Sequence, residues 1–203
     1  MSHIALIGAS GDAGSRILKE LSDRGHTVTA IARHPEKIAS LPNVTAKQGE
    51  ALDKDALVAL FKGHDAVVSA VKFGSSDPAI LIAAVKTAGV KRYLVVGGAG
   101  SLEIAPGQRL IDQPDFPDAY RPEASRGAAF LDLLKQEKDL DWSFLSPSAE
   151  FVPGQRTGTF RLGKDTLLSN DQGSSISFED YAVALVDEIE NPAHSRQRFT
   201  VGY

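Results

Sequence analysis

The sequence predicts an α/β protein with a doubly wound parallel sheet, formed by a single domain over residues 1–203. Short apolar segments alternate with helix-like segments along most of the chain, which is typical of parallel strands joined by crossover helices. The first apolar segment, His3–Ile7, leads into a glycine-rich turn that is followed directly by a helix. With 203 residues and 42% hydrophobic content, the chain can bury a full core, and its length suits one domain better than two.

Seven strands are expected as apolar runs bounded by turn residues. They are His3–Ile7, Thr27–Ala32, Val44–Gln48, Ala66–Val71, Tyr93–Val96, Trp142–Leu145 and a short closing strand at Phe199–Val201. The helices between them carry start and stop signals: Asp77 followed by Pro78 begins a helix, and Gly25 and Gly89 each end one. Four helices are expected at about Gly14–Arg24, Asp53–Phe61, Pro78–Ala88 and Glu123–Lys138.

The pattern weakens after Pro147, where residues 154–173 are expected to form loops and a small hairpin. Ser177 then opens the last helix, with Asp180 in the capping-box position. The segment Glu103–Ala119 is long for a connection between elements and is a candidate lid over a substrate.

The glycine-rich turn places Gly8, Gly11 and Gly14 at intervals of three between the first strand and the first helix. Gly8 allows a tight exit from the strand, and residues without Cβ let the backbone approach a pyrophosphate. Gly14 permits close packing of the helix on the strand. The free N–H groups and positive end of the helix then suit phosphates, so the turn indicates a dinucleotide site rather than an empty strand–helix connection.

The second strand ends at Arg33 and His34, where an acidic residue would hold the ribose of NADH. Arg33 offers a planar donor fork to a 2′-phosphate and could also stack on adenine, and His34 could add a donor. The alternative is a solvated basic residue that opens a turn. We therefore expect NADP(H) to be preferred over NAD(H), although an arginine here does not exclude NADH.

Small residues end four strands at the edge of the sheet where such folds bind their ligands. Each segment taken alone could be a simple turn, but four at one edge favour a groove for the coenzyme. The predicted cofactor-binding residues are Gly8, Ser10, Gly11, Asp12, Ala13, Gly14, Arg33, His34, Ala51, Leu52, Ser69, Ala70, Val71, Gly97, Ser146 and Pro147.

Candidate catalytic groups are fewer. Short-chain dehydrogenases use a serine after the fifth strand and a Tyr-x-x-x-Lys pair, in which the lysine lowers the pKa of the tyrosine for proton transfer. Ser101 is suitably placed as a donor to a carbonyl, and Tyr120 is the candidate phenol. Ala124, however, stands where the lysine is required, and neither Arg121 nor Arg126 has the right offset. The missing lysine favours an acceptor that takes hydride without an acid from the enzyme, such as an oxidised flavin.

Several motifs resemble the bacterial family named for NADH-flavin reductase, within the atypical short-chain dehydrogenase/reductases and close to biliverdin-IXβ reductases and NmrA-like proteins. The motifs are Val96–Glu103, Trp142–Ala149, Ile176–Ala182, Pro153–Gly158 and Arg198–Tyr203. The resemblance covers essentially the whole chain. It implies a Rossmann fold, a nicotinamide cofactor and a flavin (FMN, FAD or riboflavin) as substrate.

Three functional classes remain open: an NADPH-dependent flavin reductase, a carbonyl reductase or sugar-nucleotide epimerase that uses Ser101 and Tyr120, and a non-catalytic NADP(H) sensor like the NmrA-like regulators. The sequence leaves open whether the protein is a monomer or a homodimer.

Composition excludes other classes. The chain has no cysteine, which rules out disulfides and thiol catalysis, and its five histidines are scattered, so no metal site is expected. A net charge of −4 without basic clusters argues against a nucleic-acid partner, and no apolar run is long enough for a membrane span. The chain enters a strand at once without a signal peptide, so a cytoplasmic protein with a small-molecule substrate is expected.

Overall fold

A computed structural model describes residues 1–203, whose framework is an eight-stranded sheet. The sheet strands are β1 (His3–Ile7), β2 (Thr27–Ala32), β3 (Val44–Gln48), β4 (Ala66–Ser69), β5 (Arg92–Val96), β8 (Asp141–Pro147), β10 (Arg161–Gly163) and β12 (Gln197–Gly202). Their order is β10-β12-β8-β5-β4-β1-β2-β3, and all neighbours are parallel except β10 and β12. The predicted doubly wound fold is confirmed.

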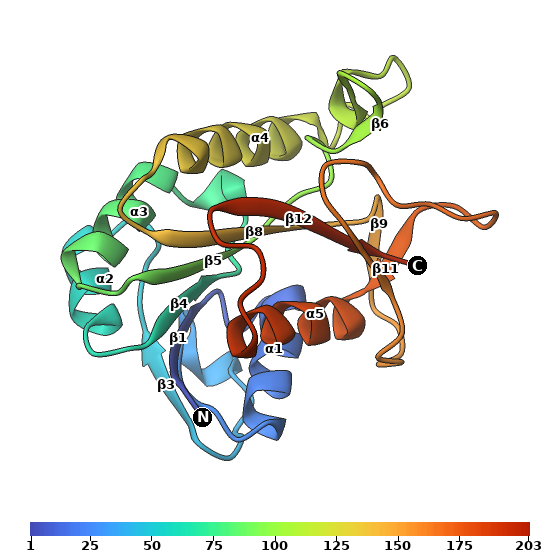
Figure 1. Ribbon diagram of the computed structural model, residues 1–203. Coiled ribbons are helices and arrows are strands. Elements are labelled where there is room, and N and C mark those ends of the chain that lie inside the picture. The colour runs from blue at the N-terminus through green and yellow to red at the C-terminus, as the bar shows by residue number, and fades with distance from the viewer.

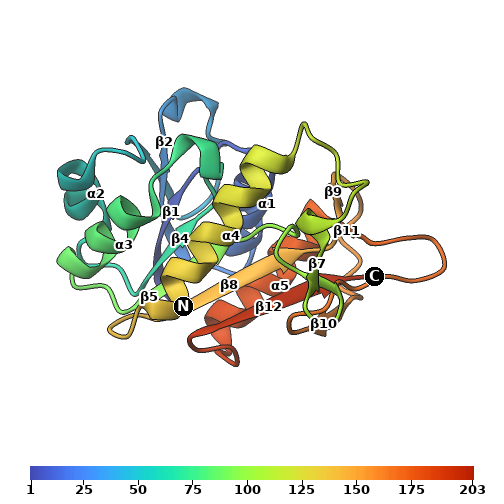
Figure 2. The ribbon, with the colours of Figure 1, turned by 90° about the horizontal axis from the view of Figure 1, so that it is seen from above.

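Five helices cover the two faces of the sheet. They are α1 (Asp12–Asp23), α2 (Lys54–Phe61), α3 (Pro78–Thr87), α4 (Arg121–Gln136) and α5 (Phe178–Glu190). Figure 1 shows α1 and α5 beneath the sheet and α4 above it, and Figure 2 shows α4 lying over the sheet beside β8. Each face has its own apolar core: residues such as Leu18, Leu21 and Leu185 fill the α1/α5 side, and Leu57 and Phe130 belong to the α2/α3/α4 side. No helix is both long and apolar enough to cross a membrane.

The helix signals act largely as expected. The Asp53 side chain accepts a hydrogen bond from Ala56 N at the start of α2, and the Asp77 side chain does the same for Ala79 N at the start of α3. Gly25 has φ of 79°, a left-handed conformation that ends α1 at low cost.

The capping box at α5 is only half formed. Ser177 Oγ accepts the hydrogen bond from Asp180 N at 2.9 Å, but the Asp180 carboxylate does not reach back to the serine backbone. It is buried and instead accepts hydrogen bonds from Thr157, Gly158 and the hydroxyl of Tyr203. This aspartate therefore ties the 153–158 segment and the C-terminus to the helix, which local sequence rules do not anticipate.

Differences from the sequence-based prediction concentrate after β5. Residues 154–173, expected to form loops and a small hairpin, are mostly loop with an isolated antiparallel bridge between Asn170 and Gly173. The strand β10 in that segment was not expected, and it pairs antiparallel with β12 at the edge of the main sheet. The expected lid contains a hairpin, β6 (Glu103–Ala105) and β7 (Gln108–Arg109). A two-stranded parallel sheet joins β9 (Glu150–Val152) to β11 (Ser175–Ser177). These strands are two or three residues long, too short to produce a readable alternation.

Candidate coenzyme groove

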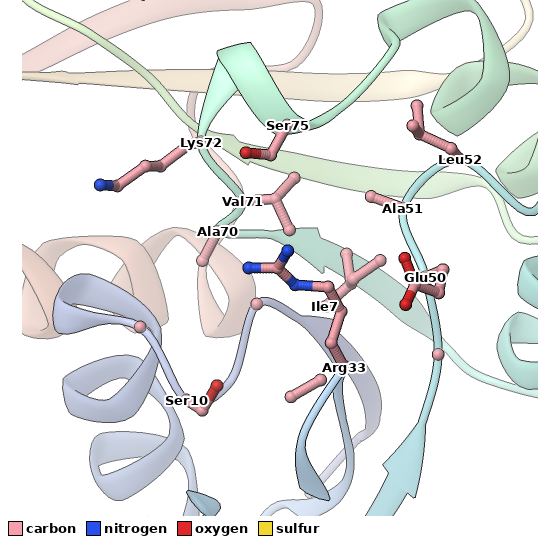
Figure 3. Close-up of a pocket in the computed structure, with 14 residues that line it drawn as sticks. Ile7, Ser10, Arg33, Glu50, Ala51, Leu52, Ala70, Val71, Lys72 and Ser75 are labelled. Atoms are coloured by element: carbon pink, nitrogen blue, oxygen red, sulfur yellow. The ribbon is translucent and has the colours of Figure 1, made fainter.

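A cavity of about 390 Å³ lies beyond the carboxyl ends of the strands, where the chain order reverses between β1 and β4. Folds of this class bind ligands at this kind of position because the connections on either side diverge to opposite faces. Figure 3 shows side chains from four strand ends around the opening. The cavity is lined by Ile7, Gly8, Ser10, Gly11, Ala32, Arg33, Gly49, Glu50, Ala51, Leu52, Ala70, Val71, Lys72 and Ser75.

The three glycines of the turn have separate structural reasons. Gly8 has φ of 86°, and a Cβ on it would lie 2.5 Å from the carbonyl oxygen of Ala70. A Cβ on Gly14 would lie 2.0 Å from the carbonyl oxygen of Gly8, so the helix packs directly on the turn. A Cβ on Gly11 would meet protein no closer than 3.4 Å, close to ordinary contact. The fold itself therefore requires Gly8 and Gly14, whereas Gly11 leaves free space at the edge of the cavity.

Helix α1 begins at this cavity without a side-chain cap. Its first backbone bond runs from Ser15 N to Gly11 O at 2.8 Å, so the N–H groups of Asp12, Ala13 and Gly14 have no acceptor in the protein. Uncapped N–H groups at the positive end of a helix suit an anion such as a phosphate. The predicted residues Asp12, Ala13 and Gly14 thus offer backbone N–H groups to a ligand. They do not line the cavity themselves, whereas Ser10 and Gly11, which precede them, do.

Arg33 follows β2 directly, and its guanidinium extends toward the middle of the cavity in Figure 3. The side chain is exposed and forms no ion pair or hydrogen bond with the rest of the protein, unlike most arginines of this chain. His34 points elsewhere: its Nδ1 lies 3.2 Å from Glu36, and it does not line the cavity. An unpaired cation, open space at Gly11 and free helix N–H groups together fit a dinucleotide that carries several phosphates.

The remaining walls come from the ends of β3 and β4. Ala51, Leu52, Ala70 and Val71 line the cavity as predicted, and Leu52 presents an apolar side chain that is 59% exposed. An exposed leucine at a groove of this kind suits the flat face of a base.

The cavity does not extend along the whole row of predicted strand ends. Ser69, Gly97, Ser146 and Pro147 lie at the ends of β4, β5 and β8 but outside the cavity lining. The cavity therefore corresponds to the end of the groove beside the glycine turn and Arg33. Five of its residues were not predicted as part of the site: Ile7, Ala32, Gly49, Lys72 and Ser75. Glu50 also lines the cavity, directly before the predicted Ala51 and Leu52. The rule that ligands lie beyond strand ends, extended by a few residues at β4, would have found Lys72 and Ser75.

The two candidate catalytic residues lie outside this cavity. Ser101 Oγ accepts a hydrogen bond from Arg198 Nη1 at 3.2 Å. Tyr120 precedes α4 and is 68% exposed, and its hydroxyl forms no hydrogen bond. Ala124 packs closely against Gly100, because a Cβ added to Gly100 would lie 2.8 Å from the Ala124 Cβ. The position that a lysine would need for the proton relay is therefore occupied by a packing contact of the helix.

Two arginines and an aromatic ring in the chain after β8 are engaged within the protein. Arg156 forms two 2.8 Å hydrogen bonds with Glu20 on α1, and Arg161 donates to the backbone of Ser169. The Phe151 ring packs against Phe178 at a centroid distance of 4.5 Å.

The fold and the groove define a Rossmann-type protein that binds a nicotinamide dinucleotide. The chain belongs to the family described as NAD(P)H-binding, whose model matches residues 8–192. It is 44% identical to the uncharacterized protein YwnB of Bacillus subtilis, over 98% of this chain and 97% of that protein.

Solved structures agree with this assignment. A "putative epimerase" from Bacteroides thetaiotaomicron is 45% identical with a TM-score of 0.94, covering 99% of this chain and 96% of that one. A "putative NADH-flavin reductase" from Streptococcus pneumoniae is 38% identical with a TM-score of 0.82, covering 100% and 99%. The resemblance to that group expected from the sequence motifs is confirmed.

Proposed function

We propose that this protein is an NADPH-dependent reductase that passes hydride to an oxidised flavin or a similar flat-ring acceptor. The observation that carries the coenzyme preference is the unpaired guanidinium of Arg33 in the cavity at the end of β2. A carboxylate at that position would accept hydrogen bonds from the ribose hydroxyls and repel a 2′-phosphate. The arginine fork instead binds a phosphate at two points.

The lack of a proton relay bears on which acceptor takes the hydride. Tyr120 is exposed without a hydrogen-bonding partner, and Ala124 stands in place of a lysine. A carbonyl acceptor needs a proton on its oxygen as hydride arrives, whereas flavin N5 takes hydride directly and solvent can protonate the product. The name of the S. pneumoniae neighbour supports a flavin. That name specifies NADH, and the residue at position 33 is our reason for preferring NADPH.

A reduced nicotinamide supplies the hydride in this scheme. The chain itself contributes placement. The N–H groups of Asp12, Ala13 and Gly14 would hold phosphate oxygens, Arg33 would hold the 2′-phosphate, and the ends of β5 and β8 would support the nicotinamide side of the groove. Holding donor and acceptor in a reactive arrangement can by itself supply much of a rate enhancement.

The test is to mix the protein anaerobically with NADPH and one acceptor at a time. FMN, FAD and riboflavin are compared with small aldehydes and ketones. We expect turnover with the flavins only, and we expect Tyr120→Phe to stay within about twofold of wild type because no proton passes through that phenol.

Two other results would redirect the assignment. Turnover of a carbonyl that Tyr120→Phe abolishes would support a carbonyl reductase or epimerase, a candidate favoured by the name of the B. thetaiotaomicron neighbour. Coenzyme binding without turnover of any acceptor would support an NADP(H) sensor.

A further inference from the structure

One wall of the cavity is formed by a short turn between β4 and α3. Lys72 and Ser75 line the cavity, and the chain from Phe73 to Ser75 forms a single helical turn directly after Lys72. Figure 3 shows this turn across the opening from Ser10, with Lys72 and Ser75 at its two ends. Within the turn, Ser75 N donates to Lys72 O at 3.0 Å and Ser76 N donates to Phe73 O at 3.5 Å, so the turn has few backbone bonds of its own.

The turn is held from outside by Glu123, in the first turn of α4. Glu123 Oε1 accepts a hydrogen bond from Phe73 N at 2.6 Å, and Oε2 accepts one from Gly74 N at 2.8 Å. Two neighbouring N–H groups thus meet the two oxygens of one carboxylate, and such charge-assisted bonds are stronger than bonds between neutral groups. We propose that Glu123 is a positioning residue for the coenzyme groove, which fixes the turn carrying Lys72 and Ser75.

The side chains of the turn fit the same helix. A Cβ on Gly127, one turn further along α4, would lie 2.6 Å from the ring of Phe73. That ring also packs against Phe130 and Phe144, at centroid distances of 5.9 and 6.3 Å. Helix α4 therefore holds the turn in two ways: the Glu123 carboxylate accepts hydrogen bonds from its backbone, and Gly127 leaves space for the Phe73 ring.

A purely structural role for Glu123 is the alternative. Helix α4 is already anchored through Phe130, Leu131 and Leu134, all buried, so its packing does not depend on a carboxylate in its first turn. What depends on the carboxylate is the turn, because without it two adjacent N–H groups lose their acceptors. Glu123 is thus the residue through which α4 fixes the position of the turn in the cavity wall.

The test compares Glu123→Gln and Gly127→Ala with a matched control, Glu137→Gln. Glutamine offers one oxygen and one NH₂ to two N–H groups, so one of them faces another donor. Gly127→Ala displaces the same turn through the Phe73 ring without a change of charge. Glu137 follows the other end of α4, where it accepts Asp139 N and pairs with Lys86, away from the cavity.

We expect Glu123→Gln to raise the Kd of both NADPH and NADH by about three- to tenfold, less than the loss of a direct charged contact to the coenzyme, because Glu123 acts through the turn. The factor should be the same for the two coenzymes, because the 2′-phosphate is assigned to Arg33. Gly127→Ala should act in the same direction, and Glu137→Gln should leave both constants unchanged.

Amide hydrogen exchange at Phe73 and Gly74 supplies a readout that does not involve activity. In the wild type these amides should be protected before coenzyme is added, and in Glu123→Gln they should gain protection only with NADPH bound. The proposal is overturned if the Kd values of Glu123→Gln and Gly127→Ala match those of the wild type, or if Glu137→Gln weakens binding as much as they do. Equal exchange at both amides in wild type and Glu123→Gln would also overturn it.

Discussion

In the proposed function, Arg33 is the residue whose identity sets the preference between NADPH and NADH. The backbone of β2 delivers it to the cavity, and its guanidinium remains unpaired there. Most other arginines are held by carboxylates or carbonyl oxygens, as Arg24, Arg92 and Arg156 illustrate. An arginine left unpaired in this cavity is best explained by a ligand that pairs with it.

Replacing this residue tests the assignment of the 2′-phosphate. Arg33→Ala should weaken NADPH by roughly ten- to a hundredfold, the equivalent of about 1.5–3 kcal/mol for a lost charged contact, and leave NADH nearly unchanged. Calorimetric titration of both coenzymes measures this. Lys37→Ala, which removes an exposed and unpaired cation four residues on, serves as the control for net charge. Equal losses for NADPH and NADH in Arg33→Ala would contradict the assignment.

Sequence reasoning identified the residues whose roles depend on neighbours in the chain. Gly8, Gly11 and Arg33 were found because their spacing from a strand is itself the signal. Lys72 was missed although it follows a strand end, because β4 ends at Ser69, two residues before the predicted end, and the site was expected to stop at Val71. Glu123 was missed for a different reason: its partners lie about 50 residues away along the chain, and nothing local indicates the contact.

At the scale of elements, the unit formed by β1, the glycine turn and α1 contains some residues that the fold needs and others that only the ligand needs. Gly14 packs against the backbone carbonyl of Gly8, which leaves no space for a side chain. Gly11 borders the open side of the cavity, and its φ of −78° is one that alanine adopts readily. The same motif therefore contains one glycine required by packing and one that the fold tolerates losing.

Two alanine substitutions should distinguish these roles. Gly14→Ala should lower the free energy of unfolding by about 2–3 kcal/mol, because its Cβ overlaps the Gly8 carbonyl. Gly11→Ala should stay within about 1 kcal/mol of wild type yet weaken NADPH at least about tenfold, because its methyl group takes the space of a phosphate. Denaturant unfolding and coenzyme titration measure the two effects. A Gly11→Ala protein that binds NADPH normally would show that this glycine does not face the coenzyme.

The chain after β5 shows where the prediction of elements fails and why. Strands β6, β7, β9, β10 and β11 have three residues or fewer, so their pairing is decided by contacts with distant segments. Long elements with clear periods were predicted to within a few residues, including α3 after Asp77 and α4, which begins at Arg121 rather than Glu123.

At the scale of the whole molecule, charged contacts join the two ends of the chain. Arg24 on α1 pairs with Glu20, and also with Asp187 and Glu190 at the far end of α5. In the same last turn of α5, Glu188 is buried and pairs with Arg92 and His194. The hydrogen bond from Arg156 holds the pKa of Glu20 below its ordinary value of 4.5, against the opposing effect of burial. Burial alone would raise the pKa of Glu188, but hydrogen bonds from His194 and Ala193 bring it below 4.5 as well.

These lowered pKa values predict how stability depends on pH. A carboxylate whose pKa is lower in the folded state stabilises the protein fully above its unfolded value, about 4.5, and this contribution is lost as the pH falls through the folded value. The free energy of unfolding should therefore decline below about pH 4.5. Glu20→Gln should cost stability near neutral pH and progressively less in acid. Urea unfolding at a series of pH values measures both, and a variant that tracks wild type at a constant offset would contradict the prediction.

The most direct measurement is a parallel titration of the wild-type protein with NADPH and NADH, followed by nicotinamide fluorescence, because it needs no knowledge of the acceptor. The account predicts saturable binding of both coenzymes, with NADPH tighter by at least about tenfold, the value of one charged phosphate contact. Equal affinity for the two, or tighter binding of NADH, would contradict the role given to Arg33 and with it the proposed NADPH-dependent reductase.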